Sequence, residues 1–175
     1  RGESHAGRWA ACGSPHCRSS DGTLGDREEG VAVGGSRSAS EWGLRLADDA
    51  ARLLGSEGLT VIAGLAAGID TAAHQAALDA GGRTVAFLGT GITQSYPASN
   101  RALQREIAQR GLLLSQFYPD APPTKQSFPM RNATMSGYGL ATIVIEAGEH
   151  SGHRIQARLA GDHGRPVILT DRAQA

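Results

Sequence analysis

No run of 18 apolar residues occurs in this sequence, which excludes a membrane-spanning helix. The first residues include no apolar signal segment, so we expect a cytoplasmic rather than a secreted protein. Seventeen basic residues balance seventeen acidic ones, and a nucleic-acid site would therefore have to come from local clustering of charge. Aromatic residues make up only 5% of the 175 residues, whereas the 24 glycines are typical of an α/β protein with many tight turns.

Cysteine is also scarce. Cys12 and Cys17 lie near His5 and His16 in a polar stretch of the chain. Their spacing matches no strong zinc motif, and the chain offers no second cysteine pair. We therefore interpret both as free thiols, and we expect neither a metal site nor a cofactor.

The composition changes near residue 30. Residues 1–29 are rich in Gly, Ser, Arg, Asp and Glu and contain almost no aliphatic side chains. Such a stretch cannot bury enough apolar surface to offset the entropy lost on ordering. We predict a disordered or remnant leader over residues 1–29, followed by one domain over residues 30–175.

Short apolar runs then alternate with helical patterns. We expect strands over 31–33, 59–63, 84–88, 112–115, 141–145 and 167–169. We expect helices opened by Ser38, with Glu41 at capping-box spacing; by Asp70; by Pro97; by Phe128; and by Ser151. Strands buried on both faces and separated by helices predict an α/β, three-layer doubly wound Rossmann-like fold with a mostly parallel sheet.

Ligands of such folds bind outside the carboxyl ends of the strands. The first turn at that edge is Gly34-Gly35-Ser36-Arg37, where bare amides, a helix N-terminus and a guanidinium group converge on a possible anion. The turn is neither a complete G-x-G-x-x-G fingerprint nor a P-loop. An ordinary tight turn between strand and helix is an equally good interpretation.

The second turn runs from Gly64 to Gly68. Its glycines allow a ligand to approach the backbone. Asp70 follows, and we expect it to cap the next helix rather than to catalyse a reaction. His74 lies one turn later without an obvious partner, so we interpret it as a packed helix histidine.

The third turn is Gly89-Thr90-Gly91. Thr90 and the later Asn100 offer side chains that can hold phosphate or sugar oxygens. Tyr96 either stacks on a base or packs beneath the turn.

A fourth group surrounds Lys125, the only lysine in the chain. Phe128, Arg131 and Asn132 follow it closely, and a basic residue beside a ring is the minimal unit of single-strand binding. Between residues 83 and 131, six Lys or Arg residues stand against two acidic ones, an excess hidden by the zero net charge. The alternative is that Phe128 plugs the core above a solvated surface.

Taken together, these turns resemble the Rossmann-like core of the DNA-processing protein A (DprA/Smf) family over about residues 31–170. The matching series, in chain order, is Gly35-Ser36-Arg37, Gly64-Leu65-Ala66, Gly68-Ile69-Asp70, Ala73-His74, Ala77-Leu78, Gly81-Gly82, Gly89-Thr90-Gly91, Tyr96-Pro97, Asn100, Phe128-Pro129, Arg131-Asn132, Glu146-Ala147, Ser151-Gly152 and Gly164-Arg165.

The resemblance implies non-enzymatic binding of single-stranded DNA, with loading of a RecA-type recombinase during natural transformation, and a homodimer. By position, Arg37 would bind phosphate, Lys125 would make a second backbone contact, and Phe128 would stack on a base. The full set of expected DNA-binding residues is Gly35, Ser36, Arg37, Gly64, Gly89, Thr90, Lys125, Phe128, Arg131 and Asn132.

The chain departs from the family pattern at several positions. Ala98 and Ala133 stand where the family usually has basic residues, and His153, Arg154 and Gln156 replace an aliphatic residue and a threonine. Two missing basic contacts would weaken the affinity for the DNA backbone and its salt dependence.

Two other classes of function stay open. One is a nucleotide-binding or nucleotide-hydrolysing enzyme of the lysine-decarboxylase-like Rossmann superfamily, in which Glu146 could act as an acid; the other is a module that binds only a protein partner. Glu146 has a structural interpretation too, as a carboxylate that accepts backbone N–H bonds from neighbouring turns. No Gly-x-Ser-x-Gly elbow supports a catalytic triad.

Overall fold

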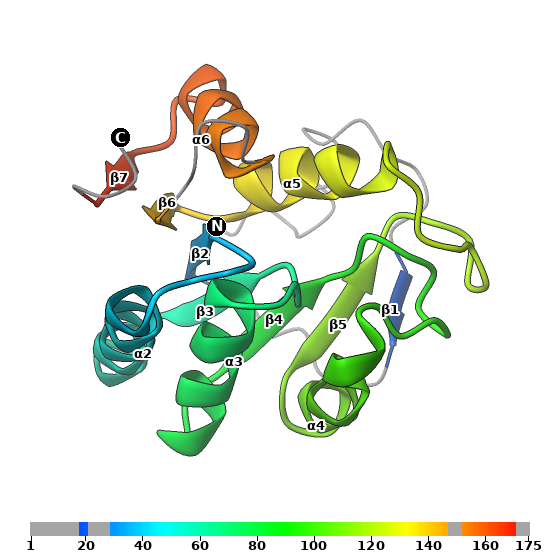
Figure 1. Cartoon of the computed structure of the whole chain (residues 1–175), viewed down its shortest axis with the longest axis horizontal. Coiled ribbons are helices and arrows are strands. Elements are labelled where there is room, and N and C mark those ends of the chain that lie inside the picture. The colour runs from blue at the N-terminus through cyan, green and yellow to red at the C-terminus, as the bar shows by residue number, and fades with distance from the viewer. Residues whose placement is uncertain (1–17, 21–28, 147–151, 171–175) are drawn as a thin grey trace, which may run out of the picture.

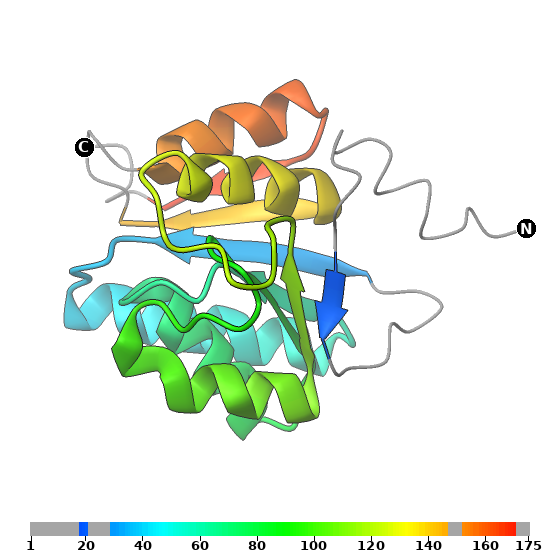
Figure 2. The same ribbon diagram turned by 90° about the vertical axis from the view of Figure 1, so that its right-hand side faces the viewer.

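A seven-stranded sheet lies between two layers of helices in the computed structural model of the chain (Figures 1 and 2). The structure describes residues 18–20, 29–146 and 152–170. The strands follow the order β1-β5-β4-β3-β2-β6-β7 across the sheet. Their bounds are β1 Arg18–Ser20, β2 Gly30–Gly35, β3 Thr60–Ala63, β4 Thr84–Phe87, β5 Leu112–Ser115, β6 Ala141–Ile145 and β7 Val167–Leu169.

Strands β2 to β7 pair in parallel, and only β1 runs antiparallel, against β5. The chain steps outward from β2 to β5 and then returns to place β6 on the other side of β2. The direction of winding therefore reverses between β2 and β6, which is where open α/β sheets form their ligand crevice. The predicted doubly wound, mostly parallel fold is confirmed.

The helices cover the two faces unequally. On one face lie α2 Glu41–Ser56, α3 Ile69–Asp79 and α4 Arg101–Arg110, the last preceded by the short 3-10 helix η1 Ala98–Asn100. On the other lie α5 Ser127–Tyr138 and α6 Gly152–Asp162 (Figure 2). None of the helices in the described part of the chain is long and apolar enough to cross a membrane.

The core follows the two-residue period of the strands. Val31 and Val33 of β2 pack with α2 and α3, whereas Ala32 between them joins Met135 and Tyr138 of α5 on the opposite face. Both faces of the central strands are therefore buried, because a parallel sheet has helices on each side. Full burial of each large aliphatic side chain contributes about 1.5–3 kcal/mol to the stability of this framework.

Two helix starts differ from the prediction. Ser40, not Ser38, caps α2, and its Oγ accepts a hydrogen bond from the amide of Gly43 at 3.2 Å. The amide of Ser38 instead bonds Ser36 Oγ at 3.2 Å, within the preceding turn. Pro97 precedes η1 rather than opening a continuous α-helix.

The interpretation of residues 1–29 as a disordered or remnant leader needs correction at three residues. Arg18–Ser20 form β1 and pair with Leu113, Leu114 and Ser115 of β5. Backbone hydrogen bonds make this pairing, so polar side chains are no obstacle to it. Residues 1–17 and 21–28 lie outside the described residues, together with Cys12, Cys17, His5 and His16.

Candidate functional site

A pocket of about 140 Å³ opens at the carboxyl edge of the sheet. Its wall combines the turns after β2, β3 and β4 with the first residues of α5. The residues that line it are Arg37, Gly64, Ala66, Ala67, Gly89, Tyr96, Pro97, Phe128 and Arg131. Five of the ten residues predicted to bind DNA therefore meet in one pocket, although they are far apart in the sequence.

An aromatic ring lies close to two arginines in this pocket. Phe128, the second residue of α5, is half-buried. The guanidinium carbon of Arg37 lies 5.4 Å from the centre of its ring, and that of Arg131 lies 6.0 Å from it. The ring of Tyr96, which is 46% exposed, lies 5.4 Å from the Phe128 ring at an angle of 40°. The site thus offers two stacking surfaces and positive charge together.

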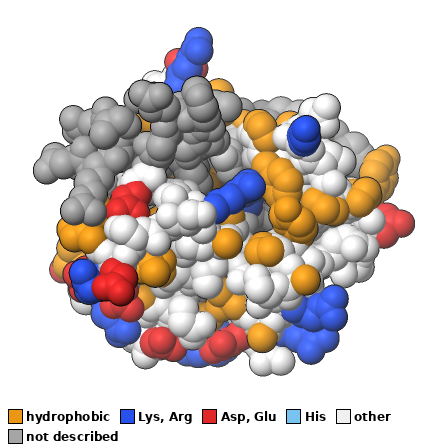
Figure 3. Space-filling view, in the orientation of Figure 1, with side chains coloured by type: hydrophobic (Ala, Val, Ile, Leu, Met, Phe, Trp, Pro, Cys, Tyr) orange, Lys and Arg blue, Asp and Glu red, His pale blue; other side chains and the backbone are white. Residues whose placement is uncertain are grey.

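Arg37 supplies the accessible charge. It is exposed in the turn after β2, and no carboxylate in the described ranges forms an ion pair with it. Because Arg37 is exposed and has no carboxylate partner in the described ranges, its guanidinium group is available to an anion that enters the pocket. On the face of the molecule seen in Figure 3, Lys and Arg side chains border a group of hydrophobic side chains.

Arg131 is different, because it is only 4% exposed. Its Nη1 donates to the carbonyl oxygens of Gly64 and of Phe87, the latter at 2.8 Å, and its Nε donates to Asn132 Oδ1 at 2.9 Å. Burial lowers the pKa of Arg131, and the nearby charge of Asp70 opposes that effect. Arg131 therefore ties the turns after β3 and β4 to α5, and Asn132, 5% exposed, orients it.

The glycines of the pocket make room for these side chains. A Cβ atom at Gly64 would overlap the guanidinium group of Arg131, and one at Gly89 would lie 2.6 Å from Cδ1 of Phe128. We expected both glycines to bring the backbone close to a ligand. In the structure they also admit the protein's own cation and ring, which is a packing requirement that the sequence does not reveal.

We predicted that Asp70 caps its own helix, and this prediction is wrong. The N-cap position of α3 is Gly68, which has no capping side chain, while Asp70 Oδ2 accepts from the amides of Gly64 at 2.9 Å and Ala66 at 3.3 Å. The buried carboxylate therefore fixes the turn that forms the pocket wall. Leu65, between the two bonded amides, has a positive φ of 57°.

His74 is buried beneath the same turn, as the packed-histidine interpretation predicts. Its Nδ1 lies 2.6 Å from Thr84 Oγ1, whose single hydrogen is donated to Val61 O at 2.9 Å. Nδ1 therefore carries the imidazole proton. Burial lowers the pKa of His74 to about 4, so the ring is neutral near pH 7.

The other predicted residues lie outside the pocket lining. Gly35 is buried against Ile145 O, and Ser36 Oγ accepts from the amide of Ser38. Thr90 is 3% exposed and donates to the carbonyl of Gly91 at 3.2 Å.

Asn100, expected to hold ligand oxygens, instead donates to Leu65 O at 3.0 Å and to Thr71 Oγ1 at 2.8 Å. The Asn100 side chain therefore stabilises the turn after β3, which forms part of the pocket wall.

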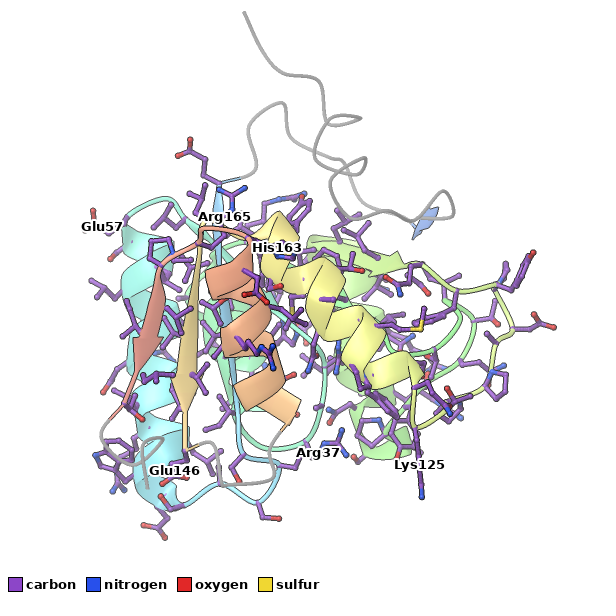
Figure 4. All side chains as sticks on the ribbon, turned by 90° about the horizontal axis from the view of Figure 1, so that it is seen from above. Arg37, Glu57, Lys125, Glu146, His163 and Arg165 are labelled. Carbon is purple, nitrogen blue, oxygen red and sulfur yellow. The ribbon has the colours of Figure 1, made fainter. Side chains whose placement is uncertain are left out.

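Lys125 is exposed in the loop before α5. Figure 4 shows Lys125 along the same edge of the molecule as Arg37, with its side chain projecting away from the protein. The two basic residues therefore share an edge without sharing the pocket. Prediction from sequence missed Ala66, Ala67 and Pro97, which line the pocket but carry no chemical signal.

Glu146 has the structural role. Its Oε2 accepts from the amide of Ser40 at 2.8 Å, and its Oε1 accepts from the Ser40 hydroxyl. The carboxylate thus joins the end of β6 to the start of α2 and does not line the pocket. In the ranges that the structure covers, no cluster of three or more His, Cys, Asp or Glu side chains could hold a metal ion.

Comparison with known protein families gives one clear match: the family described as DNA recombination-mediator protein A matches residues 14–174. DNA processing protein DprA of Streptococcus pneumoniae is 43% identical over 138 residues, covering 79% of this chain and 49% of that protein. Protein Smf of Synechocystis sp. is 40% identical over 139 residues, covering 79% of this chain and 35% of that protein. The chain thus spans between a third and a half of the length of these relatives.

Solved structures agree with the sequence relatives. The X-ray structure of DprA from Streptococcus pneumoniae has a TM-score of 0.77 and 42% identity, covering 81% of this chain and 50% of that one. The structure that gave insights into the single-stranded DNA binding mode of DNA processing protein A from Helicobacter pylori has a TM-score of 0.80 and 30% identity, covering 87% and 70%. A molybdenum cofactor binding protein from Rippkaea orientalis, 21% identical with a TM-score of 0.61, shares the fold alone.

Proposed function

This chain belongs to the DNA recombination-mediator protein A family, and from that membership we propose that it binds single-stranded DNA without catalysing a reaction on it. The pocket around Phe128 is the proposed site. The described binding mode of the Helicobacter pylori relative, at 30% identity over most of this chain, supports the proposal.

The observation that carries the proposal is the position of Phe128 close to two cations in a small pocket. A cavity of ~150 Å³ is enough to bind benzene, so a pocket of about 140 Å³ has room for one base ring. Stacking on an aromatic side chain tolerates any base, because every base has a π-face. A duplex keeps its bases stacked on each other, so the pocket favours an unpaired strand.

Arg37 is the proposed phosphate ligand. It reaches the Phe128 ring from the turn after β2 and lacks a carboxylate partner in the described ranges. Arg131 adds positive potential from beneath while its donors hold backbone carbonyls. Lys125 would contact the backbone of a strand that leaves the pocket along the shared edge of the molecule. The predicted binding residues Gly35, Ser36, Thr90 and Asn132 would act by shaping the site, since none of them lines it.

The wider activity belongs to the whole protein and is proposed on the family resemblance. It comprises the loading of a RecA-type recombinase onto the bound strand during natural transformation, in the cytoplasm, by a homodimer of this core. Residues 30–175 would form that core. Alanine at positions 98 and 133, where the family usually has basic residues, would make the affinity of this chain lower than that of more basic relatives.

The enzymatic alternative has less support. Glu146, the candidate acid, is engaged by Ser40 at the switch point of the sheet and lies outside the pocket lining. His74 is buried and bonded to Thr84. Neither side chain is placed to exchange a proton with a molecule in the pocket.

Arg37→Ala tests the proposal through salt dependence. A labelled oligo-dT should bind more weakly, and the slope of log affinity against log salt should flatten by about 0.7 for each lost phosphate contact. Lys125→Ala should do the same if the strand follows the edge. Titration by fluorescence anisotropy at several salt concentrations measures both effects.

Arg45→Ala is the matched control, since Arg45 is an exposed arginine whose partner Glu41 lies on the same helix, α2. Its slope should equal that of the unmodified protein. A slope unchanged by Arg37→Ala would remove Arg37 from the site.

A further inference from the structure

A second, larger pocket of about 420 Å³ shares a loop with the first. Tyr96 and Pro97 line the first pocket, and residues 92–95 of the same loop line the second. The remaining wall comes from α4 and β5. The lining residues are Ile92, Thr93, Gln94, Ser95, Arg101, Gln104, Arg105, Ala108 and Leu113.

Gln104 is one of the residues that line this pocket, and the oxygen of its side-chain amide is buried within the pocket wall. The side chain is only 6% exposed, and its Nε2 donates to the carbonyl of Gln94 at 3.0 Å. That bond fixes the orientation of the amide, because a carbonyl can only accept. Among the residues that the structure describes, Gln104 Oε1 is buried and has no hydrogen-bond partner. A buried acceptor without a donor is unfavourable, so a ligand gains affinity when a small rotation of the Gln104 side chain lets an N–H group of the ligand reach Oε1.

Two arginines flank this acceptor on α4. Arg101 and Arg105 are one helical turn apart, are exposed, and pair with no carboxylate in the parts of the chain that the structure covers. Among the basic residues between positions 83 and 131, Arg110 is bonded to Glu106 and Arg131 is buried. Two of the remaining four basic residues of this stretch, Arg101 and Arg105, therefore lie at this pocket.

The loop between the two pockets is held in place. The amides of Gly91 and Thr93 donate to Ala121 O and Pro119 O, both at 2.9 Å, and Thr93 Oγ1 donates to Pro119 O at 2.6 Å. The bond from Gln104 to Gln94 anchors the loop from the other side. A pre-formed wall loses little conformational entropy when a ligand binds.

From this arrangement we infer that the second pocket binds a nucleotide. A phosphate group contacts Arg101 and Arg105, an N–H group of the base donates to Gln104 Oε1, and the base packs on Ile92, Ala108 and Leu113. A sulfate or a simple carboxylate satisfies the arginines but brings no donor to Gln104 Oε1. The nucleotide belongs either to the strand held in the first pocket or to a free mononucleotide, and the first case rests on the proposed function.

The test uses the full chain with labelled oligo-dT of about 4 and about 16 nucleotides, the span of known single-strand sites. Arg101→Ala/Arg105→Ala should weaken binding of the longer strand roughly tenfold, on the scale of lost charge-assisted hydrogen bonds. The slope of log affinity against log salt should also flatten by about 0.7 per contact. Binding of the shorter strand should weaken less, because it retains the pocket around Phe128 when the second pocket is lost.

Gln104→Met probes the acceptor separately. It removes a neutral group, so it should weaken binding of the longer strand without changing the salt slope. The matched controls are Arg45→Ala/Arg52→Ala, which removes two exposed arginines from α2, and Gln109→Met, an exposed position on α4. Both controls should bind like the unmodified protein. Melting temperatures identify any variant that has lost its fold. If Gln104→Met does not fold, Arg101→Ala/Arg105→Ala still tests the proposal.

A second experiment titrates thymidine monophosphate into Arg37→Ala, in which binding to the first pocket is weakened. The second pocket binds a free nucleotide if this titration saturates, if adding Arg101→Ala/Arg105→Ala abolishes it, and if the arginine changes affect the short and long oligo-dT equally. If the arginine variants change neither measurement while Arg37→Ala still weakens oligo-dT, the second pocket is not a nucleotide site and the proposed function stands. If the unmodified protein binds no oligo-dT, the proposed function fails independently.

Discussion

Charged residues buried beneath the pocket determine the shape of its wall. Asp70 holds the amides of Gly64 and Ala66, and Arg131 holds the carbonyl of Gly64. A single turn is therefore fixed by a carboxylate on one side and a guanidinium group on the other. The sequence motif around Gly64 marked the turn as special, but it could not show that the glycine accommodates a side chain 67 positions later.

His74 makes stability depend on pH. Burial lowers its pKa from the ordinary 6.5 to about 4 in the folded protein. As pH falls below about 6.5, the unfolded chain takes up a proton that the folded chain does not, so the folded state loses stability until about pH 4. The loss reaches roughly 3 kcal/mol. Urea unfolding at several pH values should show that His74→Asn removes this component.

His163→Asn is the control for that experiment, because His163 is exposed. Its Nδ1 lies 3.4 Å from Ser136 Oγ, next to the end of α6. The control should keep the pH dependence of the unmodified protein. An equal pH dependence in His74→Asn and the unmodified protein would show that the buried histidine is not its source.

At the scale of helices and strands, local pattern predicted most elements. The strands fall where apolar runs occur, because a parallel sheet buries both faces of its strands. The start of α2 was predicted less well, since Ser38 and Ser40 both suit an N-cap and the deciding partner, Glu146, is 106 residues away. Strand β1 was missed because its pairing is made by the backbone at the edge of the sheet.

Ser40→Ala tests the observed start of α2. The change removes the bond to the amide of Gly43 and the bond to Glu146, so it should lower the free energy of unfolding by about 0.5–2 kcal/mol. Ser38→Ala, at the position that the sequence favoured, should change it by less than about 0.5 kcal/mol. Chemical denaturation of the two variants measures the difference, and the reverse order of effects would contradict the observed cap.

At the scale of the whole molecule, the topology decides which residues meet. The parallel pairing of β2, β3 and β4 places the turns after these strands at one edge of the sheet, and α5 brings Phe128 to them from the opposite layer. The series of glycine-containing turns, in their order along the chain, was enough to predict this fold and about half of the residues that line the pocket. The sequence could not separate Arg37, which is accessible, from Arg131, which is buried, because both are arginines beside the same ring.

Zero net charge conceals a positive edge made by a few residues. Arg37 and Lys125 lie along it, and Arg101 and Arg105 line the neighbouring pocket. A single strand can follow such an edge with its bases turned inward, whereas a duplex cannot expose its bases to a pocket of this size.

The most direct measurement of this account compares Phe128→Ala with the unmodified protein, using a labelled single strand and a duplex of equal length. The unmodified protein should bind the single strand more tightly than the duplex. Phe128→Ala should lose on the order of 1–3 kcal/mol of single-strand binding, with a smaller loss in the free energy of unfolding. Unchanged single-strand binding with a large loss of stability would show that Phe128 is only part of the core and would contradict the account.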